Sequence, residues 1–146
     1  MPEKETLERA KKDKREGKAP STQAGEFVHE EIEHVREGKH GARSTKQAIA
    51  IGLSKARRAG VKLPPPKKAS KETREQAARD TRKAKSGARK KKSVKRSRAT
   101  LAALKREGHR AASKKALSRQ ATRAAAKRSA ASRSRAAKKA AATRKK

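Results

Sequence analysis

Two groups of side chains in this sequence could do chemistry, and the first is the stretch HEEIEH, His29–His34. Zinc proteases carry two ligating histidines four residues apart on one face of a helix. His29 and His34 are five residues apart, and on a helix they would point about 140° away from each other. Glu30 with His34 would offer two ligands, but these residue types are common on solvated helices. We therefore predict no metal site and no bound cofactor.

The second group is the lysines and arginines, which number 46 in 146 residues, against 14 aspartates and glutamates. The formal net charge is +32, and it is unevenly distributed. Residues 1–63 hold 15 basic and 10 acidic side chains, whereas residues 64–146 hold 31 basic and 4 acidic ones. Side chains at this density neutralise the phosphates of a nucleic acid and release its condensed counterions. The composition thus predicts a polyanion as the partner.

The predicted nucleic-acid contacts form two sets of basic residues. One set surrounds the second helix of a predicted hairpin, where an ordinary solvated face is an equal alternative, and the other lies in the basic C-terminal half. Together they are Lys46, Lys55, Arg57, Arg58, Lys62, Lys67, Lys68, Arg89, Lys90, Lys91, Lys92, Lys95, Arg96, Lys114, Lys115, Arg119, Arg123, Lys127, Arg128, Lys138 and Lys139.

Several classes of function find no support in the composition. The chain has one Phe and no Trp, Tyr or Cys, so it lacks the aromatic side chains on which single-stranded bases stack. No thiol nucleophile and no Gly-rich phosphate loop is present. We predict that the protein is not an enzyme, takes no small-molecule substrate, and binds nucleic acid without reading its sequence.

The elements that position these residues are predicted to be helices. Leu, Ile, Val and Phe together number only 14, too few for an ordinary core in a chain of this charge. We predict a mostly α-helical protein with a small helical hairpin, a flexible basic linker, and a conditionally helical or disordered tail that becomes helical on binding. The segments are a charged helix at 1–17, the hairpin core at 18–63, the Pro/Lys/Arg-rich linker at 64–96 and the tail at 97–146.

Apolar residues at helical spacing predict the two helices of the hairpin. Ile49, Leu53 and Ala56 in the second helix face a stripe in the first. Because two helices rarely bury enough surface alone, the stripe is also a predicted site of homo-oligomer formation. It covers residues 24–35 and consists of Ala24, Val28, Ile32 and Val35, with Phe27 beside it.

Arg-Glu-Gly occurs three times, at residues 15–17, 36–38 and 106–108, and a Ser or Thr follows each time. Gly ends helices in the left-handed conformation, and Ser and Thr cap helix N-termini. The repeats therefore predict alternating helix ends and starts, with Ser21 or Thr22, Ser44 and Ser113 as caps. Ser44 with Gln47 also forms a capping box, and Gly60 followed by prolines predicts the end of the hairpin.

The first helix of the hairpin is acidic within a basic protein. Its carboxylates could fold back on the tail and compete with nucleic acid, or they could simply keep the helix soluble. The residues concerned are Glu26, Glu30, Glu31, Glu33 and Glu37.

Two resemblances accompany these patterns. The stretch KKALSRQATRAAAKRSAASRSRAAKKAAATRKK, within residues 64–146, resembles the Lys/Ala-rich tails of linker histones and bacterial histone-like proteins. Residues 21–68 resemble the core of a family of small basic bacterial proteins of unknown function, often labelled DNA-binding, and residues 97–121 resemble its second segment. The resemblance covers about half of the chain and implies a bacterial cytoplasmic protein of the nucleoid.

The sequence thus predicts a histone-like, nucleoid-associated protein that binds duplex DNA by neutralising phosphates. Two other classes use the same charges: an RNA- or ribosome-associated protein, and a scaffold for another polyanion or a storage granule. No apolar run is long enough to suggest a membrane partner.

Overall fold

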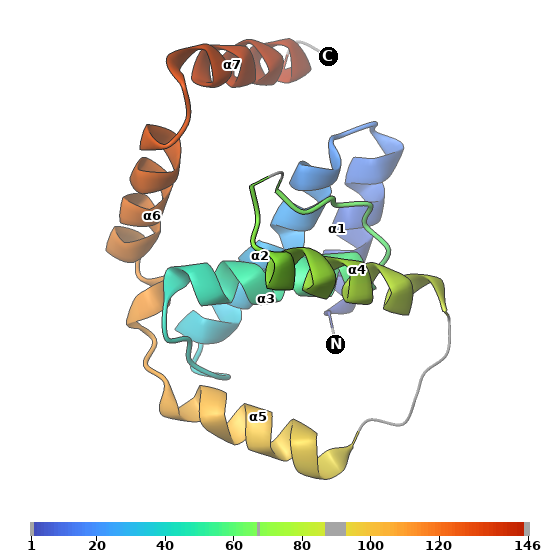
Figure 1. Ribbon diagram of the computed structural model, residues 1–146, viewed down its shortest axis with the longest axis vertical. Coiled ribbons are helices and arrows are strands. Elements are labelled where there is room, and N and C mark those ends of the chain that lie inside the picture. Colours follow the sequence, from blue (N-terminus) through green and yellow to red (C-terminus); the bar gives the residue numbers. More distant parts are fainter. Residues whose placement is uncertain (1, 67, 87–92, 145–146) are drawn as a thin grey trace.

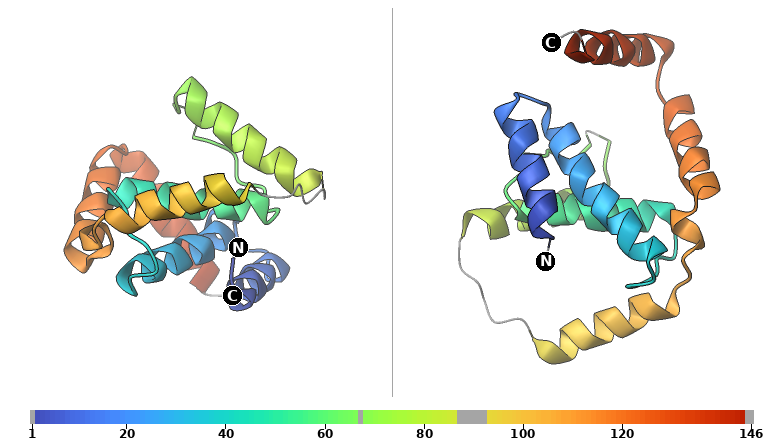
Figure 2. Two further views of the ribbon diagram at one scale, coloured as in Figure 1. Left: turned by 90° about the horizontal axis from the view of Figure 1, so that it is seen from below. Right: turned by 180° about the vertical axis from the view of Figure 1, so that it is seen from behind.

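The computed structural model describes residues 2–66, 68–86 and 93–144. These residues form helices and no strand, which confirms the prediction of a mostly α-helical protein (Figure 1). α1 and α2 lie side by side and cross α3, and α4 lies on the other side of α3 (Figure 2). The elements are α1 (Lys4–Arg15), α2 (Pro20–Arg36), α3 (Thr45–Arg58), α4 (Lys71–Lys85), α5 (Val94–Arg106), the 3-10 helix η1 (Arg110–Ala112), α6 (Lys114–Ala126) and α7 (Ala130–Arg144).

α2 and α3 form the predicted hairpin, and they pack closely because α3 turns small residues toward α2. Ala48, Gly52 and Ala56 repeat every four residues on one face of α3, and all three are buried. A Cβ atom on Gly52 would lie 2.7 Å from the Cα atom of Val28, so the contact requires glycine. Ile49 and Leu53 are only half-buried beside this contact. Of the three residues predicted to face the first helix, Ala56 is fully buried, and Leu53 packs partly buried against the apolar cluster around Phe27.

Two clusters of apolar side chains bury the stripe of α2 within the monomer. Phe27, 1% exposed, packs with residues of α1, α3 and the segment that follows α3. Val35, fully buried, packs with residues 42, 48, 111 and 112. The stripe over residues 24–35 is therefore covered by the chain itself, which removes the exposed apolar surface on which the prediction of self-association rested.

Most of the predicted helix ends and caps are present. Gly17, Gly38 and Gly60 have positive φ angles of 69°, 74° and 96°. The hydroxyl groups of Ser44 and Ser113 accept hydrogen bonds from the backbone N–H groups of residues 47 and 116. These local signals therefore act as their sequence predicts.

The repeats depart from the pattern at two points. α2 begins two residues before the predicted caps, with Ala19 at the N-cap and Pro20 in the first turn. Proline favours this position because its fixed φ suits the helix and its missing N–H would have no partner there. Gly108 has no positive φ, because α5 ends at Arg106 in an extended Glu107 rather than in a left-handed turn.

α4 occupies part of the segment that was predicted to be a flexible linker. Its Asp80 is 0% exposed, receives a hydrogen bond from the hydroxyl of Ser54, and is paired with Nε of Arg58 at 2.7 Å. Burial alone would raise the pKa of Asp80, but the hydrogen bonds from Ser54 and Arg58 lower it below its ordinary value. Ala77, 3% exposed, packs one turn away. α4 is thus fixed to α3 mainly by one carboxylate, a contact that apolar periodicity cannot reveal.

The close approach of α2 and α3 predicts that Gly52→Ala destabilises the protein by about 1–3 kcal/mol, because the new methyl group would overpack against the backbone of α2. Chemical unfolding in urea measures this change. The matched control is Gly25→Ala in α2, where a Cβ atom meets nothing within 4 Å and where alanine should stabilise the helix by about 0.5–1 kcal/mol. Equal effects of the two substitutions would contradict the proposed packing.

The Asp80 contact predicts that Asp80→Asn lowers the free energy of unfolding by about 1–2 kcal/mol at neutral pH. Since the folded-state pKa of Asp80 is lowered, its contribution is present above the unfolded value of about 4 and is lost as the pH falls through the folded value. The difference between wild type and variant should therefore shrink in acid. Glu75→Gln on the exposed face of α4 removes the same charge and should have almost no effect. A pH-independent difference would show that Asp80 acts through packing alone.

Candidate nucleic-acid interface

Three of the cations predicted to bind nucleic acid around α3 are instead engaged within the fold. Nζ of Lys55 lies 3.1 Å from Glu30 and 2.6 Å from Glu31. Arg57 is 8% exposed and donates a hydrogen bond to the carbonyl of Leu63. Arg58 pairs with Asp80. These contacts hold Lys55 and Arg57 inside the fold and leave them little surface for phosphates, whereas the side chain of Arg58 remains half exposed beside Asp80.

The buried carboxylates of Glu30 and Glu31 stabilise the charged form of Lys55. Burial alone would lower the pKa of Lys55, but Glu31 and Glu30 raise it above its usual value. The ion pairs bridge α2 and α3 inside the hairpin. Removing both carboxylates would leave a largely buried ammonium group without compensation, which is costly.

The acidic residues of α2 pair with neighbouring cations of the folded body rather than with the tail. Glu26 accepts a hydrogen bond from Arg9 of α1 at 2.7 Å, and Glu33 accepts one from Arg36 at 2.7 Å. Glu37 lies 3.0 Å from Nζ of Lys39. In this arrangement the carboxylates balance the charge of the body. The hypothesis that they compete with nucleic acid for the tail gains no contact in its favour among the described residues.

The second and third Arg-Glu-Gly loops pack against each other. The backbone N–H groups of Gly41 and Ala42 donate to the carbonyls of Leu104 and Gly108, at 2.9 and 3.1 Å. A Cβ atom on Gly41 would lie 1.9 Å from the carbonyl oxygen of Glu107, so the two loops can approach this closely only because residue 41 is a glycine. The loop that follows α5 is therefore fixed to the loop that precedes α3.

η1 continues this contact and joins the tail to the core. Thr45 donates to the carbonyl of Ala111 at 2.6 Å, and Arg36 donates to the carbonyl of Ala112 at 2.9 Å. Ala111 and Ala112 are 9% and 0% exposed, and Leu117 of α6 packs beside them. The region from 104 to 117 thus belongs to the folded body, although the sequence predicts that the whole of 97–146 is tail.

α5, α6 and α7 are rich in basic residues and almost free of carboxylates. Residues 93–144 contain 17 lysines and arginines and one acidic residue, Glu107. In the part of the chain that the structure describes, no side-chain carboxylate lies within 4.0 Å of any of these cations. None of the residues in the three helices is buried. Their charges therefore face solvent and are free to meet phosphates.

The surface around these helices includes most of the predicted tail residues and some that were missed. Lys95, Arg96, Lys114, Lys115, Arg119, Arg123, Lys127, Arg128, Lys138 and Lys139 are exposed as predicted. Seven further exposed cations could have been predicted on the same ground. Each has no acidic residue within four positions along the chain, or has only Glu107 there. They are Arg98, Lys105, Arg106, Arg110, Arg133, Arg135 and Arg144.

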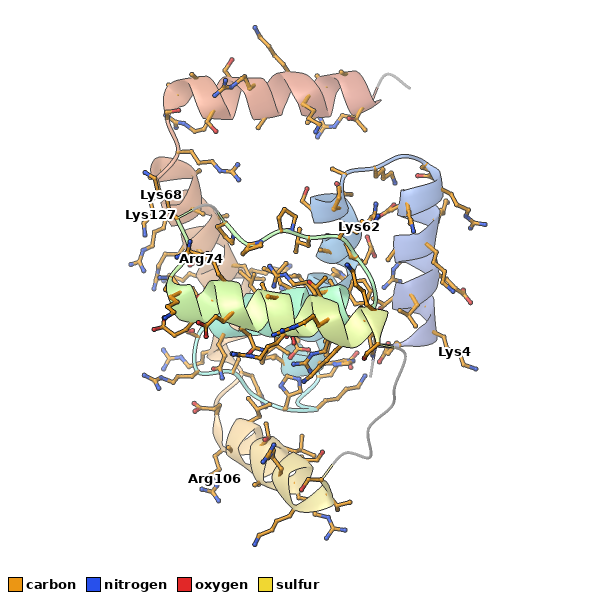
Figure 3. All side chains as sticks on the ribbon, turned by 45° about the vertical axis from the view of Figure 1, so that its right-hand side comes forward. Lys4, Lys62, Lys68, Arg74, Arg106 and Lys127 are labelled. Atoms are coloured by element: carbon orange, nitrogen blue, oxygen red, sulfur yellow. The ribbon has the colours of Figure 1, made fainter. Side chains whose placement is uncertain are left out.

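The remaining predicted contacts are scattered. Lys46, Lys62 and Lys68 are exposed at the edges of the body. Lys67 and residues 89–92 lie outside the described residues. Figure 3 shows labelled basic side chains from α1, α4, α5 and the connecting segments pointing outward on different sides of the molecule. The arrangement suits several separate contacts with an extended polyanion better than one enclosed binding groove.

Comparison with known proteins shows a similarity of the N-terminal part of the chain to a family without assigned activity. Residues 4–68 match the model of a "Family of unknown function (DUF6496)", a segment that includes α1, α2 and α3. No curated protein and no solved structure matches the chain. Among the described residues, no helix is both long and apolar enough to cross a membrane.

The contact between the two loops predicts that Gly41→Ala releases residues 104–112 from the body, because the methyl group would collide with the backbone of Glu107. Faster hydrogen exchange at the Ala42 amide and a loss of about 1–3 kcal/mol of stability are expected. The control is Gly108→Ala in the facing loop, where a Cβ atom meets nothing within 4 Å. Unchanged exchange in Gly41→Ala would mean that the loops do not dock as described.

Proposed function

We propose that this protein binds duplex DNA without sequence preference, as a histone-like protein of the bacterial nucleoid, and that α5–α7 supply the phosphate contacts. The body of α1–α4 anchors these helices through the docked region 104–117. No step of catalysis is involved. The protein compacts or coats DNA by cancelling its charge.

The observation that carries this proposal is the concentration of cations in α5–α7 almost without carboxylates, whereas the body mixes paired cations with exposed unpaired ones such as Lys4 and Lys62. In the body, Lys55, Arg57 and Arg58 are satisfied by carboxylates or carbonyls. In residues 93–144 there are 17 basic side chains and a single carboxylate. A polyanion is the partner that would satisfy them, and the free energy of its binding would come largely from counterion release.

Helix geometry supports the same conclusion. Arg119 and Arg123 of α6 and Lys127 directly after it follow one another at four-residue spacing, as do Arg135 and Lys139 of α7. Like charges at this spacing oppose an isolated helix by about 0.2–0.5 kcal/mol per pair, while the intervening alanines favour it. Phosphates would remove the repulsion and leave the alanine propensity. We therefore expect α7 in particular to gain helicity on binding.

Direct reading of bases lacks a suitable element in these helices. Their side chains are mainly Lys, Arg, Ala and Ser, and bidentate contacts to bases require a helix held in the major groove by supporting elements. α7 has no buried residue through which it could be held. Binding by phosphate contacts alone is expected to be equally strong on unrelated duplex sequences.

The experiment is a salt titration of duplex binding by the full chain and by a variant in which Arg133, Arg135, Lys138 and Lys139 are replaced by Gln. Removing up to four phosphate contacts should reduce the slope of log K against log salt by up to about 3.6, since each contact contributes about 0.9. Affinity should fall most at low salt. Fluorescence anisotropy with two unrelated duplexes and one structured RNA of equal length measures all of these quantities.

The matched control replaces Lys4, Lys11, Lys14 and Arg15 of α1 by Gln, which removes the same net charge from the body. Its slope should stay close to that of the wild type. Equal slopes for the two variants would mean that net charge rather than α7 governs binding and would overturn the assignment of the contacts. Tighter binding to the RNA than to both duplexes at matched salt would replace DNA by RNA as the partner.

A further inference from the structure

Besides the basic surface, the structure contains a cluster of a carboxylate and two imidazoles. Glu31, His34 and His40 each present one ligand atom, and these atoms lie within 4.8 Å of one another. His34 stands one turn after Glu31 on α2, and His40 belongs to the loop between α2 and α3. The sequence prediction considered His29 and His34, but His29 is exposed and takes no part. The fold instead joins His34 to a histidine six residues later.

The carboxylate of Glu31 is the unusual member of this group. Its side chain is 1% exposed, and neither oxygen has a hydrogen-bond partner of good geometry in the described structure. Lys55 lies 2.6 Å from Oε2 as an ion-pair partner, while Oε1 faces Nε2 of His40 at 3.1 Å. A buried carboxylate oxygen without a hydrogen bond is costly unless a cation neutralises it.

One nitrogen of each ring is engaged by an acceptor. Nδ1 of His40 lies 3.0 Å from the carbonyl oxygen of Gly41, and Nε2 of His34 lies 2.9 Å from Oε1 of Glu3. Both oxygens can accept a hydrogen bond but cannot donate one. A neutral imidazole therefore carries its proton on the nitrogen that faces the oxygen, which is Nδ1 in His40 and Nε2 in His34. The lone pairs then lie on Nε2 of His40 and on Nδ1 of His34. Histidines that ligate metals are oriented in this way, by a carbonyl or a carboxylate on the other nitrogen.

In neutral His40 this arrangement directs a lone pair at the buried Oε1 of Glu31. Two acceptors at 3.1 Å repel each other unless a positive charge lies between them. A proton on the imidazole or a metal ion could supply that charge. The two imidazoles meet edge to face with their centroids 6.2 Å apart, so a second ring is available to the same ion.

The local charge suits a divalent cation even though the protein as a whole is strongly basic. Lys55 is shared by Glu30 and Glu31, and Lys39 is shared by Glu3 and Glu37. Four carboxylates against two ammonium groups leave two negative charges. A shallow cleft of about 160 Å³, lined in part by His34, Glu3 and Glu37, gives solvent access to this side of the cluster.

We propose that Glu31, His34 and His40 form a binding site for a divalent transition-metal ion of the zinc class. Two imidazoles and one carboxylate are a ligand set that favours such ions over Mg²⁺ or Ca²⁺. Ligands about 2 Å from a tetrahedral ion are about 3.3 Å apart, so the ring of His34 would move inward slightly on binding. The ion would join α2 to the loop that holds the docked region 104–112, and this role is independent of the proposed DNA binding.

Titration of the full chain with Co²⁺ at neutral pH tests the site, because tetrahedral Co²⁺ gives intense visible absorption. One equivalent should bind, and Zn²⁺ should displace it. His34→Gln and His40→Gln should each weaken binding by about tenfold or more. His29→Gln and His109→Gln, which remove the two exposed histidines, are the matched controls and should bind as the wild type does.

Circular dichroism shows whether each variant keeps its helices. An NMR titration of the wild type with Zn²⁺ tests the site without any variant. In that measurement, Zn²⁺ should shift the imidazole NMR resonances of His34 and His40 and leave those of His29 and His109 in place. Absence of saturable binding, or shifts confined to the exposed histidines, would overturn the proposal. The cluster would then be a pair between protonated His40 and Glu31.

Discussion

The structure depends on the position of its few carboxylates. Residues 3–80 contain 13 of the 14 acidic residues and 20 basic ones, whereas residues 81–146 contain 26 basic residues and one acidic one. In the first part, carboxylates pair with cations across helices, as Glu26 does with Arg9 and Asp80 with Arg58. Such pairs in a partly buried setting specify which helices meet more than they add stability. The same distribution leaves α5–α7 without internal partners, so one constraint shapes both the fold and the proposed function.

The body folds with few large apolar side chains because its backbones approach closely. Ala48, Gly52 and Ala56 allow α2 and α3 to touch, and Gly41 allows two loops to hydrogen-bond along their backbones. Close contact buries Phe27, Ile32 and Val35 almost completely, and other large residues such as Leu53 pack partly buried beside them. Dense packing of small residues thus replaces the volume of an ordinary core.

The sequence predicts those features that depend on neighbouring residues and misses those that depend on distant ones. Ser44, Ser113 and Gly60 act as predicted because a cap is decided within four residues of the chain. The partner of Asp80 lies 22 residues away, at Arg58, so the segment around Asp80 reads as a basic linker and the helix α4 was missed. Thr45 and Ala111 are 66 residues apart, and the hydrogen bond between them uses a backbone carbonyl, so no pattern of side chains predicts it.

The same distinction separates the predicted contacts that stay exposed from those that the fold engages. Cations of the tail such as Arg123 and Lys139 are exposed as expected, because almost no carboxylate is within their reach along the chain. Lys55 and Arg57 were predicted to contact nucleic acid because they appear on the outer face of an isolated helix. Their partners, Glu31 and the carbonyl of Leu63, are brought to them by tertiary packing, which a helical wheel does not show. His40 escaped notice for a related reason, since a metal pattern on one helix cannot include a loop residue.

Under the proposed function, the two ends of the basic region would have different tasks. The segment 104–117 is held by hydrogen bonds to the loop between α2 and α3, and this loop also carries His40 beside Glu31. Anything that stiffens the loop, whether an ion or a proton on His40, would therefore also fix where α5 and α6 leave the body. α7 has no buried residue and is joined to α6 through residues 127–129, so its direction is not set by the body. A fixed base with a free basic end can stay attached to one stretch of polyanion while its last helix follows the next, which a wholly disordered tail would do only at a larger cost in conformational entropy.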